Sequence, residues 1–546
     1  MRALRAAALY LVLTVLLTTP LAFRLRTMDA GDSAYFAWVM AWEAHALKTD
    51  PARLPHGNMF HPLRYTLGMD EPVFGTTLLV LPLFLVTDDA VLVFNLARLL
   101  TFVLSALAAY LLVRSLAAAE LPALLAGAAF AFSPIRTDQI AHLSTLGTQW
   151  LPLVLLFLFR FFRLGRARDA LLAALFFVLE ALACGYHGLV GLIVLPMAVL
   201  PLLKGRRSRL PMALLAAALA ALGLAPLYLL HHAALAPLHY ARGVAETEQF
   251  SAALESFLAT GSWNHIWGEA TAPFRTTYSN NLFPGLVLPL SVVAGAIALR
   301  REGRRPSREA VALGLMALAA VAVALGPEVR LLGRDLGPGP FALARRLPIF
   351  RMIRVPSRAG AFIALALAAL AAKAWTRWRG HPVRLLLIGA AALAETVIAP
   401  IPMPAWAQVV DSRRPPPPVY AWLAAQPDEP VVAELPIQGV EGIVTRPAFH
   451  ESIYLVRSTR HWKPLVNGYA GIEPEPYLQL REAVRRFPSD AALDALRRRD
   501  VRYVVVHQGG YGPLKWARIE RDLPLFSGAL REVARFDGDT VYELAR

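Results

Sequence analysis

Cysteine is almost absent from this chain, and charged residues of any kind are scarce. The 546 residues include a single cysteine, Cys184. One thiol excludes an intrachain disulfide and argues against a cysteine-ligated metal site. Charged residues make up only 17% of the chain, whereas 56% is hydrophobic and the mean hydropathy is +0.47. This composition excludes an ordinary soluble protein and indicates an integral membrane protein.

Long apolar runs recur from residue 6 to residue 400. A helix of about 20 mostly apolar residues crosses a membrane. The apolar run from Val73 to Val86 is only about 14 residues long, a length more typical of an interfacial or re-entrant segment. Eleven other segments are predicted to span, at residues 6–23, 91–113, 121–135, 148–163, 170–184, 188–203, 210–230, 283–299, 310–326, 359–376 and 383–400.

Positive charge gathers in short turns between these runs. The formal net charge is +16. In a soluble chain this excess would suggest nucleic acid binding, but here it follows the positive-inside rule, so no nucleic acid partner is expected. Arginine-rich turns lie at 163–168, 204–209, 300–308 and 377–384.

The charge pattern predicts a topology in the inner membrane. If the run Val73 to Val86 does not span, all four arginine-rich turns and the N-terminus are cytoplasmic. Residues 6–23 fit a signal peptide or an uncleaved anchor, and we favour the anchor because a polar loop follows at once. The segments then predicted on the extracytoplasmic face are 24–90, 136–147, 231–282, 327–358 and everything after residue 400.

The composition changes after Pro400, which predicts three parts: a transmembrane domain at 1–400, a proline-rich linker at 401–418, and an α/β domain at 419–546. The linker contains four consecutive prolines, which favour a stiff extended chain. Residues 431–435, 501–506 and 540–544 are predicted strands, and residues 477–487 and 490–499 are predicted helices. The α/β domain is predicted to be extracytoplasmic and accessory, capping the site or holding an acceptor.

Two acids follow the first apolar segment closely. Asp29 and Asp32 are three residues apart, near enough to act together as a general base and its orienting or cation-binding partner. Alternatively, Asp32 caps a helix that starts near Ala34. These acids are the predicted catalytic residues, and a divalent metal remains open.

Arginines are the predicted ligands of a lipid phosphate, because guanidinium groups bind phosphate oxygens bidentately. Arg98 lies inside an apolar segment, where it either has a functional role or extends to the lipid headgroups. Arg351, Arg354 and Arg358 lie on the face where positive charge is not expected. They suit either a carrier phosphate or nonspecific contact with anionic headgroups.

Six further polar residues are secondary candidates. The simpler explanation of these residues is turn formation, a polar loop face or a satisfied histidine at the interface, and a catalytic role is the alternative. They are His61, Glu71, Asp138, His142, Glu180 and His187.

The order of motifs resembles a known family. An acidic outer loop is followed by Asn95-x-x-Arg98-Leu99, then by Tyr110 to Arg114 and by Phe132-Ser133-Pro134. Over residues 6–165 this is similar to the membrane-embedded GT-C glycosyltransferases, particularly the bacterial relatives of protein mannosyltransferases and aminoarabinose transferases. It also resembles uncharacterised polytopic bacterial membrane proteins with an Arg-Val-Pro-Ser-Arg segment.

The resemblance implies a GT-C-like fold and a transferase. It assigns the base or its metal partner to Asp29 or Asp32, and the carrier phosphate to Arg98 with Arg351, Arg354 or Arg358. The chain departs from the family pattern at one point: it has His61-Pro62-Leu63 and no His-Pro-Pro, so the donor-side part of the resemblance is not matched. The predicted fold class is an α-helical polytopic membrane protein with a small C-terminal α/β domain.

The expected function is transfer of a sugar from a polyprenyl-phosphate donor to an acceptor hydroxyl, with membrane lipids as further partners. The alternatives are a lipid or polysaccharide transporter or flippase, and a noncatalytic assembly protein. A cavity shared by the acids and the arginines would favour the enzyme, whereas a continuous path between inverted halves would favour transport.

Overall fold

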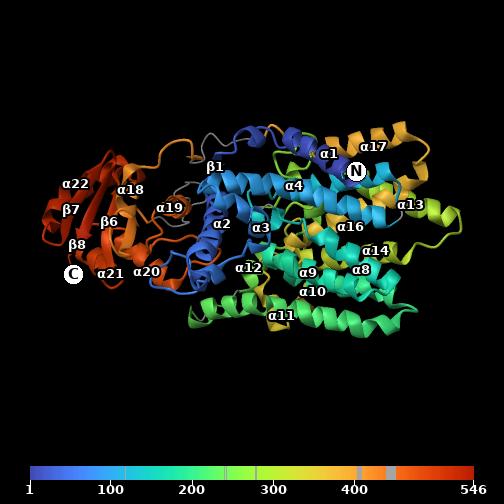
Figure 1. Ribbon diagram of the computed structural model, residues 1–546, viewed down its shortest axis with the longest axis horizontal. Helices are drawn as coiled ribbons and strands as arrows, with labels where there is room; N and C mark the ends of the chain where they lie inside the picture. Colours follow the sequence, from blue (N-terminus) through green and yellow to red (C-terminus); the bar gives the residue numbers. More distant parts are fainter. Residues whose placement is uncertain are drawn as a thin grey trace.

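The computed structural model describes residues 1–116, 118–238, 240, 243–276, 280–401, 409–437 and 450–545. Two parts are evident in Figure 1: a long helical domain, and a sheet domain formed by the C-terminal residues. Helix α2 (Asp32–Thr49) and helix α19 (His450–Ser458) contact each other where the two parts meet.

A helix covers most of each of the eleven segments predicted to span the membrane. Five stretches of the described residues are long and apolar enough to cross a membrane: Ala90–Ser115, Leu143–Leu164, Gly185–Leu203, Arg207–Leu238 and Pro356–Trp378. The chain is therefore a membrane protein, whereas the number of spans stays a prediction. The eleven helices are α1 (Arg2–Leu17), α4 (Ala90–Ser115), α5 (Glu120–Ala131), α8 (Leu151–Leu164), α9 (Ala167–Ala183), α10 (Gly185–Leu203), α11 (Leu210–Leu235), α13 (Val287–Arg301), α14 (Arg308–Ala324), α16 (Gly360–Trp375) and α17 (Pro382–Ala394).

Local sequence sets the ends of several of these helices. Asp89 caps α4 by accepting a hydrogen bond from the Leu92 N–H at 3.0 Å. Helix α8 ends at Gly165, whose φ of 73° suits a residue without a Cβ. Helices α10, α14 and α16 pack together in the core, while α11 runs along the margin with most of its surface exposed.

The predicted interfacial run forms two short pieces, α3 (Phe74–Val80) and the 3₁₀ helix η4 (Leu81–Leu85). Helix α3 lies against α9 so closely that a Cβ at Gly75 would stand 2.1 Å from the Leu179 carbonyl oxygen. Only glycine allows this approach. The first loop is thereby attached to the helical domain on the side where α2 begins.

Helix α2 is the helix predicted near Ala34, but it begins at Asp32, so Asp32 lies in its first turn and does not cap it. Its side chains from Ser33 to Ala44 are all buried, including Tyr35, Trp38 and Trp42. Up to Ala44 the helix is enclosed by the helical domain on one side and the sheet domain on the other, and only its last turn, with Lys48 and Thr49, is exposed to water. Gly31, with φ 87°, precedes it.

The sheet domain has the strand order β5-β6-β8-β7. Strands β5 and β6 are parallel, and the other pairs are antiparallel. The strands predicted at 431–435, 501–506 and 540–544 correspond to β5, β6 and β8; β7 was not predicted. The elements are α18 (Pro418–Ala424), β5 (Val431–Leu435), α19, α20 (Glu475–Val484), α21 (Asp490–Arg497), β6 (Val501–His507), α22 (Pro513–Asp522), β7 (Leu530–Phe536) and β8 (Asp539–Leu544).

Part of the predicted linker, residues 402–408, lies outside the described residues, as do 438–449 and 546 of the predicted α/β domain. Directly after the first of these gaps, β4 (Val409–Asp411) pairs antiparallel with β1 (Thr27–Asp29). The chain entering the sheet domain is therefore tied to the first loop, just before α2.

Among the described residues, four further short α-helices and one hairpin lie in the loops between the long helices. They are the helices α6 (Pro134–Thr137), α7 (Leu143–Leu146), α12 (Val244–Gln249) and α15 (Phe341–Ala344), and the hairpin β2 (Glu328–Leu331) with β3 (Arg334–Pro338).

Candidate active site

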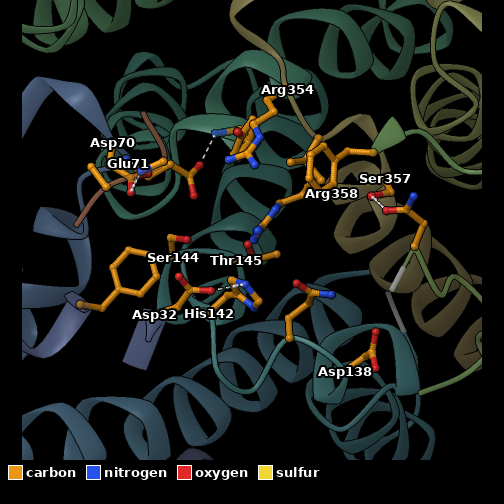
Figure 2. A pocket seen from close by; sticks show the side chains of 18 of the residues that line it. Asp32, Asp70, Glu71, Asp138, His142, Ser144, Thr145, Arg354, Ser357 and Arg358 are labelled. Carbon is orange, nitrogen blue, oxygen red and sulfur yellow. Dashed lines mark hydrogen bonds and ion pairs between the residues drawn. The ribbon is translucent and has the colours of Figure 1, made fainter. Parts of the chain in front are cut away.

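A cavity of about 700 Å³ lies between the helical domain and the sheet domain. Its walls come from the start of α2, residues 135–145, the loop at 280–282, the segment before α16, and residues 468–473 of the sheet domain. Figure 2 shows acidic and basic side chains turned into this one space. Six of the predicted site residues line the cavity: Asp32, Glu71, Asp138, His142, Arg354 and Arg358.

Asp32, at the start of α2, has two hydrogen-bonding partners. One carboxylate oxygen lies 2.8 Å from Nε2 of His142, and the other accepts a 2.8 Å hydrogen bond from the Tyr469 hydroxyl. Burial raises the pKa of Asp32, but the charge and hydrogen bond of His142 and the hydrogen bond of Tyr469 outweigh it and lower the pKa to about 2. Asp32 is therefore ionised, and 38% of its side chain is exposed.

A second carboxylate, Asp70, accepts backbone hydrogen bonds from the Glu71 N–H at 2.7 Å and the Gly471 N–H at 2.6 Å. Burial, with the charges of Glu71 and Asp32, raises the pKa of Asp70 to about 6. Glu71 accepts the Tyr186 N–H at 3.1 Å, which ties this wall to the start of α10. The cavity therefore holds carboxyl groups of two different acidities.

Arg354 and Arg358 provide the positive charge of the cavity. Arg354 lies 2.8 Å from a carboxylate oxygen of Glu246 and stacks over the ring of Phe250. The guanidinium of Arg358 stacks over the ring of Tyr186, and its Nε and Nη1 atoms are buried with no hydrogen-bond partner among the described residues. An arginine with unused donors beside a cavity is suited to bind an anion.

Asp138 lines another part of the cavity, where its carboxylate accepts a 3.1 Å hydrogen bond from the Asn281 side chain. Burial raises the pKa of Asp138 to about 6. Gly261 lies directly behind it, since a Cβ there would stand 2.1 Å from the carboxylate. The Asn281 side-chain oxygen has no partner among the described residues. This polar end suits a ligand rich in hydroxyl groups.

The other predicted catalytic and phosphate-binding residues lie outside the cavity lining. Asp29 is the last residue of β1. Arg98 is buried, and its guanidinium donates to the Ser33 hydroxyl at 2.7 Å, beneath the start of α2. Arg351 is exposed and donates to the Arg345 carbonyl at 3.2 Å. Their predicted roles remain predictions.

The remaining secondary candidates form structural contacts. The His61 backbone N–H donates to the Leu465 carbonyl at 2.8 Å, which joins the first loop to the sheet domain. Glu180 and His187 form a fully buried pair at 2.7 Å between α9 and α10. None of these three residues lines the cavity.

Tyr469, Gly471 and Asn281 were not identified from the sequence. Tyr469 is 437 residues from its partner Asp32. No local pattern marks such a contact, although the polar Asn467-Gly468-Tyr469-Ala470-Gly471 stretch is typical of a loop.

Among the described residues, no group of three His, Cys, Asp or Glu side chains is placed to hold a metal ion. Asp32 is oriented by His142 and Tyr469 rather than by neighbouring carboxylates. The described lining of the cavity therefore does not form a metal site.

Comparison with solved structures shows the fold. The chain is similar to the oligosaccharyltransferase of Archaeoglobus fulgidus, at 14% identity and a TM-score of 0.53, covering all of this chain and 74% of that one. It is also similar to the mycobacterial arabinofuranosyltransferase AftD, at 16% identity and a TM-score of 0.51, over 99% of this chain and 41% of that one. ArnT from Cupriavidus metallidurans has 14% identity and a TM-score of 0.46, over 99% of this chain and 97% of that one.

The first two of these neighbours, the oligosaccharyltransferase and the arabinofuranosyltransferase, share the fold of this chain, so the predicted GT-C-like resemblance is confirmed at the level of the fold. No curated protein matches the chain in sequence. A family model described as "Domain of unknown function (DUF6311)" matches residues 8–395, most of the chain and nearly all of the helical domain. The chain therefore belongs to the DUF6311 family.

Proposed function

We propose that this protein is a membrane glycosyltransferase that moves a sugar from a polyprenyl-phosphate donor to an acceptor hydroxyl. The observation that carries the proposal is that Asp32, Arg354 and Arg358 line one cavity. A base and a phosphate-binding group must flank the reacting carbon from two sides, and this cavity holds both. The GT-C fold supports the same class of reaction, and the Archaeoglobus neighbour is known in complex with a dolichol-phosphate and an inhibitory peptide.

In the proposed reaction, the acceptor oxygen attacks the anomeric carbon and the bond from that carbon to the carrier phosphate breaks. The electron pair of the broken bond stays with the phosphate, whose negative charge is stabilised by Arg358 and Arg354. The acceptor proton passes to Asp32. A carboxylate with a low pKa can take this proton because the acceptor oxygen becomes strongly acidic as its bond to carbon forms.

The two partners of Asp32 have distinct proposed roles. His142 orients the carboxylate from the helical domain. Tyr469, which belongs to the sheet domain, donates a hydrogen bond to the second carboxylate oxygen of Asp32. The acceptor hydroxyl replaces Tyr469 at this oxygen when substrate binds. We further propose that the cavity opens on the extracytoplasmic face of the inner membrane, with the N-terminus in the cytoplasm, as the arginine-rich turns predict.

The test is replacement of Asp32 by asparagine, which preserves size and removes the base. A positioned general base contributes typically about 10²- to 10⁴-fold, so the Asp32→Asn protein should lose nearly all transfer while inserting normally. Cells that carry it should accumulate one lipid-linked sugar, and extraction of these lipids would identify the donor. Asp88→Asn is the matched control, because Asp88 is an exposed acid of the same loop. Full complementation by Asp32→Asn would contradict the proposal.

A further inference from the structure

Of the five arginines that precede α16, Arg345 is buried, and the other four divide into two sets. Arg354 and Arg358 line the cavity, whereas Arg346 and Arg351 are exposed. In the part of the chain that the structure describes, neither exposed arginine pairs with a carboxylate. Arg330, in the nearby hairpin, is different, because it pairs with three acids. The charge of Arg346 and Arg351 is therefore available to an external anion.

Large apolar side chains are exposed beside these two arginines. The exposed fractions are 67% for Leu343, 58% for Leu347 and 37% for Ile349. A short stretch with several exposed aliphatic residues next to cations has the composition of an amphipathic membrane-contact segment.

The position of this stretch fits the membrane boundary. A candidate membrane span begins at Pro356, only a few residues after the 3₁₀ helix η9 (Pro348–Met352). The sequence from Phe341 to Arg358 contains five arginines and no acid. Aliphatic side chains here can enter the lipid boundary while the guanidinium groups stay at the level of the headgroup phosphates.

We propose that Leu343, Arg346, Leu347, Ile349 and Arg351 form a membrane-contact surface that binds the headgroup phosphates of anionic phospholipids. This surface lies next to the cavity and does not depend on the proposed reaction. Where Arg354 and Arg358 bind the carrier phosphate, as proposed above, the bulk lipid is bound by other arginines of the same segment.

The first test measures contact with lipid. Leu347→Cys in the full-length chain is labelled with a bimane fluorophore and reconstituted into phosphatidylcholine vesicles that contain brominated lipid. Leu525→Cys is the matched control, since Leu525 is 80% exposed. It follows α22, which lies at the end of the sheet domain away from α2 (Figure 1). The native Cys184 is buried. Bromine should quench the label at 347 and not at 525; equal quenching at the two sites would refute contact.

The second test measures headgroup selectivity in vesicles that mix phosphatidylglycerol with phosphatidylcholine, with either lipid brominated. One surface arginine gains about 1 kcal/mol from an anionic membrane, which corresponds to about fivefold enrichment of phosphatidylglycerol at the label. The double variant Arg346→Gln, Arg351→Gln should lose this preference, and the double lysine variant should keep it.

The matched control for charge is Arg486→Gln with Arg498→Gln, two exposed arginines of the sheet domain. This pair should leave the lipid preference unchanged. Two outcomes would overturn the assignment to these two arginines. Either the control variant also loses the preference for phosphatidylglycerol, or the Arg346→Gln, Arg351→Gln protein keeps it.

Discussion

A buried histidine in the sheet domain leads to a prediction whose size follows from the structure. His507, on β6, lies 2.9 Å from Glu434 on β5 and 2.7 Å from Asp539 on β8. Burial lowers the pKa of His507, but the hydrogen bonds and charges of the two carboxylates outweigh it and raise the pKa to about 9. The ring is therefore a cation at neutral pH and links three strands.

The raised pKa has a defined consequence for stability. A rise from 6.5 to about 9 corresponds to about 3 kcal/mol at 1.36 kcal/mol per pKa unit. Because the folded state holds the proton more tightly, this contribution is fully present below pH 6.5 and is lost as the pH rises through 9. The nearby Tyr420 hydroxyl also donates to Glu434, and Arg457 lies over the Tyr420 ring.

The perturbation is His507→Gln, which removes the cation and leaves two buried carboxylates without it. Breaking a buried pair in this way typically costs about 3–5 kcal/mol. The substituted protein should be less stable at pH 6 to 7 and should lack the decline in stability that the unsubstituted protein shows between pH 6.5 and 9. The exposed His265 provides the control substitution, His265→Gln.

The assay is labelling of an introduced cysteine, which is practical because the chain has a single native cysteine. Ala433 is fully buried on β5, on the opposite face from Glu434, so Ala433→Cys reacts with a thiol reagent only when the sheet domain opens. Corrected for thiolate ionisation, the labelling rate should rise roughly a hundredfold from pH 6.5 to 9, as expected for about 3 kcal/mol. A rate that is flat over this range, or equally steep after His507→Gln, would refute the reasoning.

Four further predictions concern topology, stability and the cavity. A reporter fused at Gly205 should be active in the cytoplasm and one fused after Ser412 in the periplasm; the reverse at Gly205 would require another span. Burial raises the pKa of Glu43 to about 8, so it stays protonated in the folded chain while the unfolded chain ionises above pH 4.5. Glu43→Gln should therefore raise the melting temperature by an amount that grows between pH 4.5 and 8, and a gain independent of pH would contradict this. Arg358→Lys should raise the donor KM at unchanged acceptor KM, because charge is kept and bidentate geometry is lost; free replacement by lysine would argue against phosphate binding. Tyr469→Phe should shift the acid limb of the kcat/KM profile for the acceptor to higher pH, since it removes from the free enzyme a hydrogen bond that lowers the pKa of Asp32. An unchanged acid limb would show that Tyr469 does not act on the titrating group.

Much of the helical domain was predictable because apolar run length is a local property. Each of the eleven segments contains a helix, and the short run after Val73 forms two brief pieces rather than one long helix. The sheet domain was predicted less completely. Strand β7 lies at the edge of the sheet and carries three charged residues, Arg531, Glu532 and Arg535, so its sequence lacks the apolar signal of β6.

The candidate site was predictable only in part. The sequence identified Asp32, Arg354 and Arg358 from their residue types and their positions next to apolar segments. It did not separate Asp32 from Asp29, or Arg358 from Arg351, because neighbours a few residues apart share the same composition. In the structure, one member of each pair lines the cavity and the other does not.

The sequence by itself indicated that the chain is a membrane protein, where its helices lie, and which loops carry the candidate acids and arginines. These properties depend on hydrophobicity and charge over short windows. Only the tertiary structure decided which of those side chains meet, because the cavity is closed by contacts such as Tyr469 with Asp32 that join residues far apart in the chain. Such contacts arise from the packing of α2 between two domains, and no local pattern encodes them.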